Sequence, residues 1–347
     1  MEKKDMKIFT HMKKMFLVVV CLSIIIVYLM WTSQGKHIVV SSFMKLDQTN
    51  DPITCTTSFK DLRIFHNVNK DLPTIYFVTP TYPRREQVAE LTRLGQTLMH
   101  IPALHWIVAD DTPECSPMIS ALLPKFGIPY THISSPMPQI YRSNNAIPPR
   151  GVSNRRAALA WIRTFIKTGV VYFGDDDNTF DLKLFDEIRG TKKISMFPVG
   201  LIGSYGISSP VLRKGNVIGF FDSWPAKRKF PVDMAGFAVN VDLILKHPNA
   251  TMPYKAGYEE DRFISSLGVK MSDIEPKANN CSEILVWHTQ TLKKPPPTVK
   301  VTMELLSIVD TSLVKLFEEL KFLGMGSMST HEGTKSYLTK DGKMYRL

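Results

Sequence analysis

Three consecutive carboxylates, Asp175, Asp176 and Asp177, follow directly on the apolar segment VVYFG at 170–174. Acidic side chains at the carboxyl end of a buried strand lie where open α/β sheets bind their ligands. Hard divalent cations such as Mg²⁺ or Mn²⁺ take carboxylate oxygens and share their remaining positions with substrate phosphates. The triplet therefore predicts a metal–diphosphate site. The alternative is a solvated acidic turn that caps the next helix.

A second acidic group consists of Glu259, Glu260 and Asp261. Crowding raises the pKa of at least one such carboxyl toward that of a useful general base. As an alternative, the same acids favour a helix N-terminus through the helix dipole. The residue pattern alone does not choose among the three carboxyls.

Glycine-rich phosphate loops are missing from the sequence, since neither G-x-x-x-x-G-K-[ST] nor G-x-G-x-x-G occurs in it. This excludes the loops of P-loop enzymes and protein kinases. A diphosphate that is bound through a metal instead of a loop points to a nucleotide-sugar enzyme.

The elements that must position these groups follow an α/β pattern. Buried strands are predicted at 74–80 and 104–109, with a helix between them over 84–99, which makes a βαβ unit. A second helix is predicted over 151–167, before the strand at 170–174. After Pro231 the pattern loosens into mixed strands and helices. An amphipathic helix is predicted within 299–323, and the last twenty or so residues look frayed.

Residues 15–31 form an uncharged apolar segment that is long enough for a short membrane span. A cleaved signal peptide is the alternative, but its apolar region is usually shorter and ends in a small-residue cleavage site. The short span favours the Golgi, with the C-terminal part in the lumen. Five lysines precede the segment and orient it: Lys3, Lys4, Lys7, Lys13 and Lys14.

The formal net charge of +11 arises from 43 Lys+Arg and 32 Asp+Glu in 347 residues. Part of the excess lies in the lysines ahead of the apolar segment, so no nucleic-acid partner is predicted. Beyond the span, an odd number of cysteines suggests one thiol left over, and Cys55 is the candidate for an intermolecular bridge or a free cysteine. Asn249 and Asn280 begin sequons and are predicted glycosylation sites in a lumenal chain.

Seven motifs, in order, resemble the β-1,3-glucuronyltransferases of glycosyltransferase family 43. They are VTPTYPR (78–84), LHWIVADD (104–111), PPRGVSNRR (148–156), VVYFGDDDNTF (170–180), FPVDMAGFAV (230–239), GYEED (257–261) and ILVWHT (284–289). The resemblance implies a GT-A type fold with a Rossmann-like half and an acceptor half, Mn²⁺ as cofactor, UDP-glucuronate as donor, a galactose-terminated acceptor, and a homodimeric, single-pass type II Golgi membrane protein.

The resemblance also implies a role for each matched residue. Glu260 is expected to be the catalytic base and Asp177 the direct metal ligand. The acceptor-side residues are expected to be Arg228 and Asp233. The donor-binding residues are expected to be Tyr82 and Asp111 at the uracil, Arg150 and Arg155 in the nucleotide pocket, Asp175 and Asp176 at the ribose and donor sugar, and His288 near the diphosphate.

Two positions depart from the pattern of many relatives. Ser208 stands where they carry a glutamate that contacts the acceptor galactose. Gln290 stands where they carry a diphosphate-binding arginine, and the loss of one charge-assisted bond, worth about 1.5–3 kcal/mol, predicts weaker donor binding.

The predicted activity is transfer of glucuronate, with inversion, to the 3-hydroxyl of a terminal β-galactose, in the proteoglycan linker or on a glycoprotein. The alternatives are another donor such as UDP-xylose on the same fold, and a noncatalytic Golgi partner subunit. The predicted parts are a cytoplasmic tail (1–14), a transmembrane anchor (15–31), a stem (32–72), a catalytic domain (73–297) with a UDP-binding half (73–180) and an acceptor half (181–297), and a C-terminal extension (298–347).

Overall fold

A computed structural model describes residues 52–65, 71–142, 147–224, 226–291, 295–302, 318–340 and 343–346. The predicted tail and anchor lie outside the described residues, as does most of the predicted stem. Among the helices that are described, none is long and apolar enough to cross a membrane.

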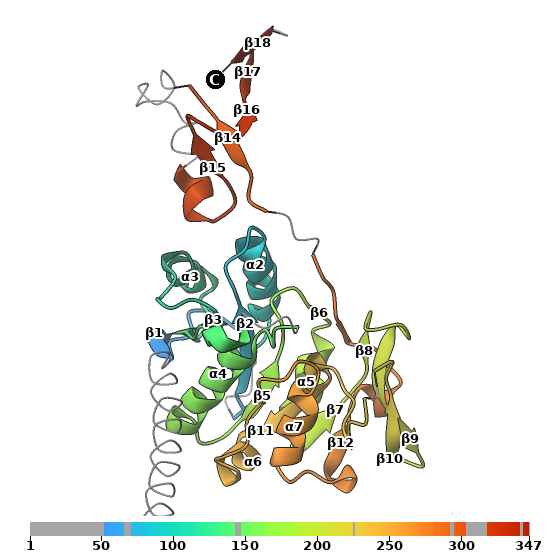
Figure 1. Ribbon diagram of the computed structural model, residues 1–347. Coiled ribbons are helices and arrows are strands. Elements are labelled where there is room, and N and C mark those ends of the chain that lie inside the picture. The colour runs from blue at the N-terminus through green and yellow to red at the C-terminus, as the bar shows by residue number, and fades with distance from the viewer. Residues whose placement is uncertain are drawn as a thin grey trace, which may run out of the picture. The chain divides into compact units, whose positions relative to one another are not determined.

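An eight-stranded mixed sheet forms the centre of the fold (Figure 1). Its strands, in spatial order, are β1 (Ile53–Ser58), β4 (Tyr130–Ser134), β3 (Leu104–Asp110), β2 (Ile75–Thr81), β5 (Val170–Phe173), β11 (Phe237–Asn240), β7 (Ile194–Met196) and β12 (Ile274–Pro276). Strands β4, β3, β2 and β5 are mutually parallel, so their carboxyl ends meet at one edge. The predicted strands at 74–80, 104–109 and 170–174 are confirmed as β2, β3 and β5.

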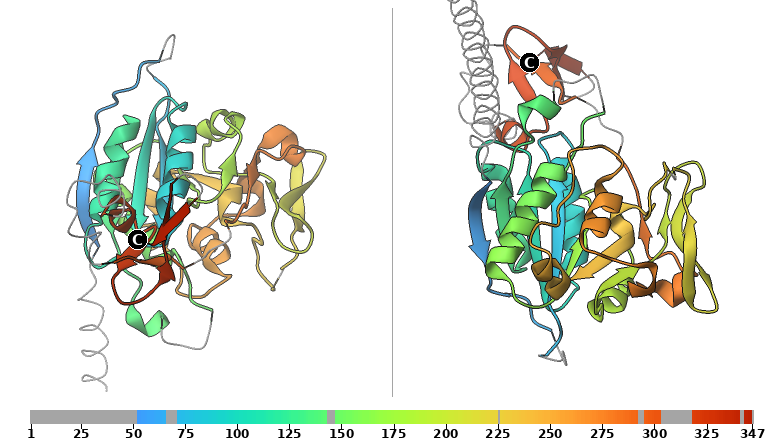
Figure 2. Two further views of the ribbon diagram at one scale, coloured as in Figure 1. Left: turned by 90° about the horizontal axis from the view of Figure 1, so that it is seen from above. Right: turned by 60° about the horizontal axis from the view of Figure 1, so that its bottom comes forward.

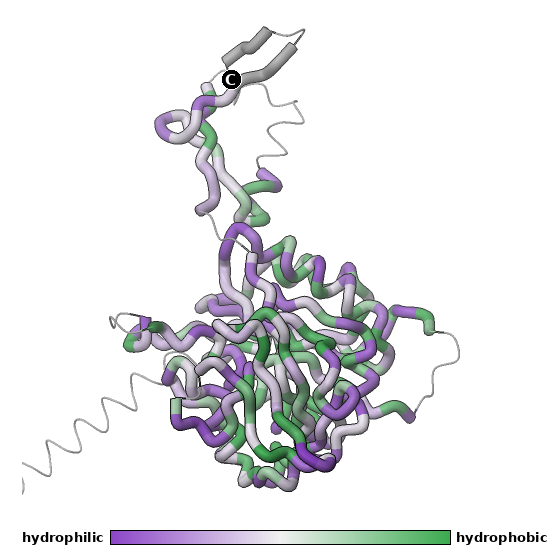
Figure 3. Tube along the Cα trace, turned by 90° about the vertical axis from the view of Figure 1, so that its right-hand side faces the viewer, coloured by the Kyte–Doolittle hydropathy of each residue, from purple (hydrophilic) through white to green (hydrophobic). Residues whose placement is uncertain are grey.

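Helices cover both faces of this sheet, because its buried strands alternate their side chains between two apolar cores. Ile75 and Phe77 of β2 belong to one core and Val78 to the other. The first core is covered by α2 (Gln87–Leu98), α3 (Pro117–Leu122) and α5 (Lys183–Arg189). The second is covered by α4 (Val152–Phe165), α6 (Val241–Lys246) and α7 (Glu259–Ser266). The predicted helices at 84–99 and 151–167 are thus confirmed as α2 and α4. Figure 2 shows the helices packed beside the central sheet, and Figure 3 shows how hydrophobic and hydrophilic residues are distributed along the chain.

Smaller elements complete the described part. The five-stranded sheet runs, in spatial order, through β10 (Asn216–Phe221), β9 (Ile207–Arg213), β8 (Val199–Gly200), β13 (Val286–Trp287) and β6 (Thr179–Phe180). The short helices are α8 (Ala278–Cys281) and the 3-10 turns η1 (Leu123–Phe126), η2 (Gln139–Tyr141), η3 (Met234–Gly236) and η4 (Met271–Asp273). Strands β7, β11 and β12 belong to the eight-stranded sheet. This sheet therefore crosses the boundary that was expected at residue 180, between the UDP-binding half and the acceptor half.

The C-terminal region differs from its prediction. A parallel sheet of β15 (Ser327–Ser329), β14 (Thr298–Lys300) and β16 (Thr334–Lys335) is followed by the hairpin β17 (Tyr337–Lys340) and β18 (Lys343–Arg346). The prediction of a frayed end is therefore wrong, because backbone pairing orders residues that show no hydrophobic periodicity. Of the helix predicted within 299–323, residues 318–322 are helical, 298–300 are a strand, and 303–317 lie outside the described residues.

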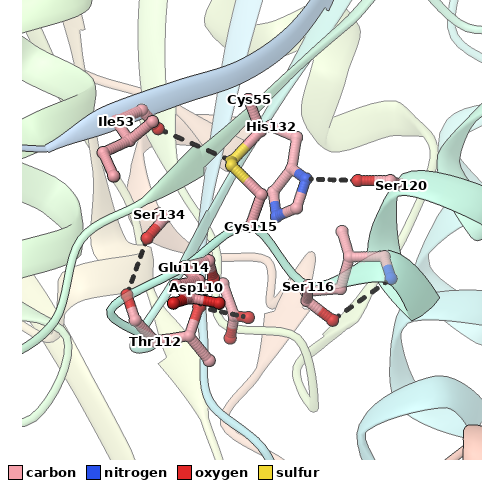
Figure 4. Close-up of a disulfide and its surroundings, with 11 residues drawn as sticks. Ile53, Cys55, Asp110, Thr112, Glu114, Cys115, Ser116, Ser120, His132 and Ser134 are labelled. Atoms are coloured by element: carbon pink, nitrogen blue, oxygen red, sulfur yellow. Dashed lines mark hydrogen bonds between the residues drawn. A yellow bond between two sulfur atoms is a disulfide. The ribbon is translucent and has the colours of Figure 1, made fainter.

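The N-terminal end of the described chain also corrects the sequence interpretation. Residues predicted to be stem form β1, which pairs antiparallel with β4 at the sheet edge. Cys55 of β1 is bonded to Cys115, so the predicted intermolecular or free Cys55 is wrong (Figure 4). Among the described residues, the free cysteine is Cys281. Burial raises the pKa of its thiol to about 11. The pairing of Cys55 depends on the fold, because its partner lies 60 residues away in sequence.

Gly174 joins β5 to the acidic triplet and allows close ring packing below it. A Cβ there would lie 2.3 Å from Cζ of Phe77 and 2.9 Å from Cζ of Phe180. We expect Gly174→Ala to lower the free energy of unfolding by about 1–3 kcal/mol through overpacking, as measured by denaturant titration. Gly190→Ala is the matched control, because nothing lies within 4 Å of its added Cβ, and it should cause no loss.

Candidate active site

A cavity of about 600 Å³ lies at the carboxyl ends of β2, β3 and β5. This position follows from the parallel strands, whose ends present successive loops at one edge. The cavity brings together eight of the predicted site residues from segments far apart in sequence: Tyr82, Asp111, Arg150, Arg155, Asp175, Asp176, Asp177 and His288. Glu260, Arg228 and Asp233 are not among its lining residues.

The acidic triplet is paired with arginines. Asp175 Oδ1 accepts a hydrogen bond of 2.5 Å from Arg155, on the first turn of α4. Asp176 is buried, and its two oxygens accept from Arg84 at 2.7 Å and from Thr81 Oγ1 at 2.6 Å. Burial raises the pKa of Asp176, whereas the bond from Arg84 lowers it. Positive groups therefore offset part of the charge that the sequence concentrates at 175–177.

Arg84 is a functional candidate that the sequence interpretation passed over. Its guanidinium lies 4.7 Å from the ring centroid of Tyr82, and that of Arg150 lies 5.6 Å from the same centroid. Arg84 Nε is buried, with no hydrogen-bond partner among the described residues. The motif VTPTYPR contains this arginine, but only the fold shows that it pairs with Asp176, which lies far along the chain.

Asp111, expected at the uracil, lies at the cavity wall just after β3. Its Oδ1 accepts a hydrogen bond of 2.6 Å from the backbone N–H of Met137 and a second one from the Arg142 guanidinium. Arg142 also lines the cavity. It comes from the connection between β4 and α4, where no motif in the sequence distinguishes it, so sequence reasoning missed it.

His288 lines the cavity and contacts Asp233, which the resemblance places on the acceptor side. Its Nδ1 lies 3.1 Å from Asp233 Oδ2, and its Nε2 lies 3.2 Å from the side-chain amide of Gln290. The bond to Asp233 raises the pKa of His288 to about 9, although burial acts in the opposite direction. The imidazole is therefore cationic at neutral pH and can hold an anion in the cavity.

Glu260 lies in the first turn of α7, outside the lining of the cavity. Protein atoms surround its carboxyl, although part of the residue's surface is accessible. Burial raises the pKa of Glu260 to about 8, and the carboxylates of Glu259 and Asp233 add to the shift. The nearby guanidinium of Arg155 acts in the opposite direction and lowers this pKa.

The tertiary structure distinguishes the three acids of the GYEED motif. Asp261 is buried, and its Oδ1 accepts hydrogen bonds from the backbone N–H groups of Lys229 at 2.7 Å and Phe230 at 2.9 Å. Its role is therefore structural. Burial raises the pKa of Glu259, and it raises the pKa of Glu260 to about 8.

Arg228 belongs to a cluster of its own beside the β9–β10 hairpin. It donates to Asp222 at 3.1 Å, and its guanidinium lies 5.1 Å from the ring centroid of the half-exposed Trp224. Trp224 packs edge-on against Tyr258, just before α7. Ser208, on β9, is buried, and its hydroxyl has no hydrogen-bond partner among the described residues.

Both predicted glycosylation residues, Asn249 and Asn280, are exposed. Asn280 lies in α8, which is a left-handed turn with φ between 52° and 59° at all four of its residues. Asparagine tolerates this conformation better than most residues. The surface location leaves both side chains accessible to modification.

A divalent cation fits this site if the phosphates of a bound substrate complete its coordination. Within the described ranges, no three His, Cys, Asp or Glu side chains form a preassembled cage. Asp177 lines the cavity and offers the hard carboxylate oxygens that Mg²⁺ and Mn²⁺ prefer. Such cations are commonly held by one or two carboxylates together with substrate phosphates. The carboxylate of Asp177 agrees with this mode of metal binding.

Comparison with known proteins gives one consistent relationship. The model of glycosyltransferase family 43 matches residues 94–292. The Drosophila melanogaster galactosylgalactosylxylosylprotein 3-beta-glucuronosyltransferase S is 50% identical over 319 residues, which cover 90% of this chain and 77% of that protein. The human galactosylgalactosylxylosylprotein 3-beta-glucuronosyltransferase 2 is 43% identical over 64% of this chain and 70% of that protein.

The Caenorhabditis elegans galactosylgalactosylxylosylprotein 3-beta-glucuronosyltransferase sqv-8 is 44% identical over 68% of this chain and 70% of that protein. The family match covers the segment that carries α4, the acidic triplet, α7 and His288. The resemblance read from the seven motifs is therefore confirmed, and the chain belongs to glycosyltransferase family 43.

Proposed function

We propose that this protein is an inverting β-1,3-glucuronosyltransferase, which moves glucuronate from UDP-glucuronate to the 3-hydroxyl of a terminal β-galactose. The observation that carries the proposal is the cavity at the strand ends, where the acidic triplet and arginines meet a cationic histidine. The family and the names of the relatives support the donor and acceptor classes.

The cavity provides groups for each part of a UDP-sugar. Tyr82 and Asp111 lie on the β2 and β3 loops and suit a base that needs an aromatic face and a hydrogen-bond acceptor. Arg150, Arg155 and protonated His288 supply positive charge for a diphosphate. In this division of roles, Asp175 orients ribose or donor sugar, and Asp176 acts through Arg84.

Asp177 is the residue proposed to hold Mn²⁺. A bound cation would neutralise charge that develops on the leaving diphosphate. We expect EDTA to abolish transfer and excess Mn²⁺ to restore it. Asp177→Asn should lower the apparent Mn²⁺ affinity at least about tenfold, as measured by metal titration of UDP binding. Metal-independent UDP binding and transfer would contradict this assignment.

Glu260 is the proposed general base. Its carboxylate takes the proton from the galactose 3-hydroxyl while the oxygen forms a bond to C1 of the donor sugar. The C1–O bond to the diphosphate breaks, and its electron pair stays with UDP. Attack from the face opposite the leaving group converts the α-linkage of the donor into a β-linkage. The carboxyl requires a raised pKa for this task, because a general base works best when its pKa lies near the pH at which the enzyme operates.

Arg228 and Asp233 are proposed to bind the acceptor galactose. Trp224, beside Arg228, presents a half-exposed ring of the kind that packs on the apolar face of a sugar. Ser208 is a short neutral residue on the neighbouring strand β9. The proteoglycan linker is the proposed acceptor, because the relatives are named for galactosylgalactosylxylosylproteins, and glycoprotein ends are the second choice.

One assay tests the activity directly. The purified full chain is incubated with UDP-glucuronate, Mn²⁺ and a panel of galactose-terminated acceptors, including a galactosyl-galactosyl-xyloside. We expect glucuronate to be transferred with β-configuration, as shown by product NMR. Transfer from UDP-xylose but not from UDP-glucuronate would favour the alternative donor. Binding of UDP without transfer from either donor would favour a noncatalytic partner subunit.

The remaining proposals concern the setting of the enzyme. We propose a GT-A type catalytic domain over 73–297, preceded by β1, in a single-pass type II Golgi membrane protein anchored by residues 15–31. The Cys55–Cys115 disulfide supports an oxidising compartment, and the exposed Asn249 and Asn280 suit glycosylation there. A homodimer is proposed from the family. Protease protection of microsomes and size-exclusion chromatography test these two proposals.

The pH dependence of transfer should have two limbs. The Glu260 carboxyl has a pKa of about 8 and must be ionised to accept a proton, so kcat/KM should rise with pH up to that value. His288 has a pKa of about 9 and must be protonated to hold the diphosphate, so kcat/KM should fall above it. We expect a maximum between the two values. His288→Asn should remove the alkaline limb while the acidic limb remains.

A further inference from the structure

The Cys55–Cys115 disulfide attaches the sheet edge to the loop that carries Asp111. This loop runs from the end of β3 to Ser116, the N-cap of α3. Cys55 lies where the β1–β4 register shifts, between the pairs Thr54–Ile133 and Thr56–His132. Figure 4 shows the disulfide beside His132, with Thr112 and Glu114 in the same loop.

A continuous set of contacts connects Cys115 to both neighbours of Asp111. The hydroxyl of Thr112 donates to the carbonyl of Glu114, next to Cys115, at 2.7 Å and lies 3.0 Å from Asp110 Oδ2. Ser134 Oγ donates to the carbonyl of Thr112 at 2.7 Å, from the strand that pairs with β1. Movement of Cys115 away from β1 would therefore shift the residues on either side of Asp111.

The buried side of the loop leads to the acidic triplet. Gln87 Nε2 donates to Asp110 Oδ1 at 3.2 Å and to Thr81 Oγ1 at 3.1 Å, and Thr81 Oγ1 donates to Asp176. Asp110 itself is fully buried. By contrast, Pro113 and Glu114 are exposed, so packing does little to hold that end of the loop. The disulfide supplies the missing attachment.

We propose that the Cys55–Cys115 disulfide is a positioning element for donor binding, which holds the 110–116 loop so that Asp111 faces the nucleotide base in the cavity. The inference rests on the proposed function, because it takes the nucleotide of a UDP-sugar as the ligand. It assigns a role in the site to a segment, residues 53–58, that lies outside the family match. The disulfide affects binding of the donor and leaves the chemical step, at Glu260, unaltered.

The test variant is Cys55→Ser/Cys115→Ser, with UDP as the probe in calorimetry and UDP-glucuronate in kinetics. We expect the Kd of UDP and the KM of the donor to rise about fivefold while kcat stays within about twofold. Thr57→Ala is the matched control, since it removes a 3.3 Å bond to Thr131 in the same β1–β4 pair without contacting the loop. It should lower Tm and leave KM unchanged.

A double-mutant cycle distinguishes positioning of Asp111 by the disulfide from a general loss of stability. In an Asp111→Ala background, removal of the disulfide should change the Kd of UDP by less than about 1.5-fold, because the group it positions is gone. Reduction of the folded wild type with dithiothreitol should reproduce the weaker binding, which covers the case of a variant that folds poorly.

Four outcomes distinguish the hypotheses. Unchanged UDP affinity after removal or reduction of the disulfide would overturn the inference, as would an equal loss in Thr57→Ala. A wild type that binds no UDP in the presence of Mn²⁺ would instead overturn the proposed function. A donor-specific rise of KM that disappears in the Asp111→Ala background supports both.

Discussion

Glu260→Gln should lower kcat by about 10²–10⁴-fold, because the amide keeps the shape of the side chain but cannot accept the acceptor's proton. UDP binding should be retained, since Glu260 does not line the cavity proposed to hold the donor. Single-turnover kinetics together with UDP calorimetry measure both quantities. Wild-type turnover by Glu260→Gln would remove Glu260 from the role of base.

The same variant should be more stable than the wild type at pH 8. The folded-state pKa of Glu260 is raised to about 8 from an ordinary value of 4.5. The stability that the neutral carboxyl provides is therefore fully present below pH 4.5 and is lost as the pH rises through about 8. Glutamine does not ionise, so its advantage in Tm should grow between these values. Glu259→Gln is the matched control from the same helix turn, and it should retain most activity.

Arg84→Met should cause the largest loss of stability among the single changes considered. Arg84 and Asp176 form a 2.7 Å ion pair in which each side chain is only 7% exposed. Removal of one member leaves the other charge buried without its partner, which typically costs about 3–5 kcal/mol. Denaturant titration at pH 7 measures this cost, and the donor KM should rise in parallel because Tyr82 loses the guanidinium beside its ring.

A second variant tests whether the loss comes from the orphaned carboxylate. Arg84→Met/Asp176→Leu removes both charges, so it should recover part of the stability lost in Arg84→Met. Lys183→Met provides the comparison with an exposed pair, because Lys183 and Glu283 are 51% and 37% exposed, and Tm should not change measurably. Equal losses in Arg84→Met and Lys183→Met would show that burial of the Arg84–Asp176 pair is unimportant.

The positions of the acidic triplet and of the βαβ unit were predictable from the sequence. VVYFG is a buried strand by composition alone, so the residues after it must lie at a strand end. The seven motifs then identified the family and eight of the side chains that meet in the cavity. Local patterns suffice here because strand burial and chain direction depend on neighbouring residues.

The roles of individual charged groups were decided by the tertiary structure. Arg84 reaches Asp176, and Asp261 reaches two backbone N–H groups, across large separations in sequence. Glu260 differs from Glu259 and Asp261 only in its surroundings, which raise its pKa to about 8. No short pattern encodes these differences, because burial and charge partners are supplied by other segments.

The pairing of strands and of cysteines shows the same difference between what the sequence determines and what the tertiary structure decides. The sequence determined the strands β2, β3 and β5, the acidic strand end and the membership of family 43. Only the tertiary structure joined β1 to β4, paired Cys55 with Cys115 and ordered the strands after residue 297. The physical reason is that backbone pairing and disulfide formation depend on which segments meet in space, whereas hydrophobic patterning reports only how each segment is buried.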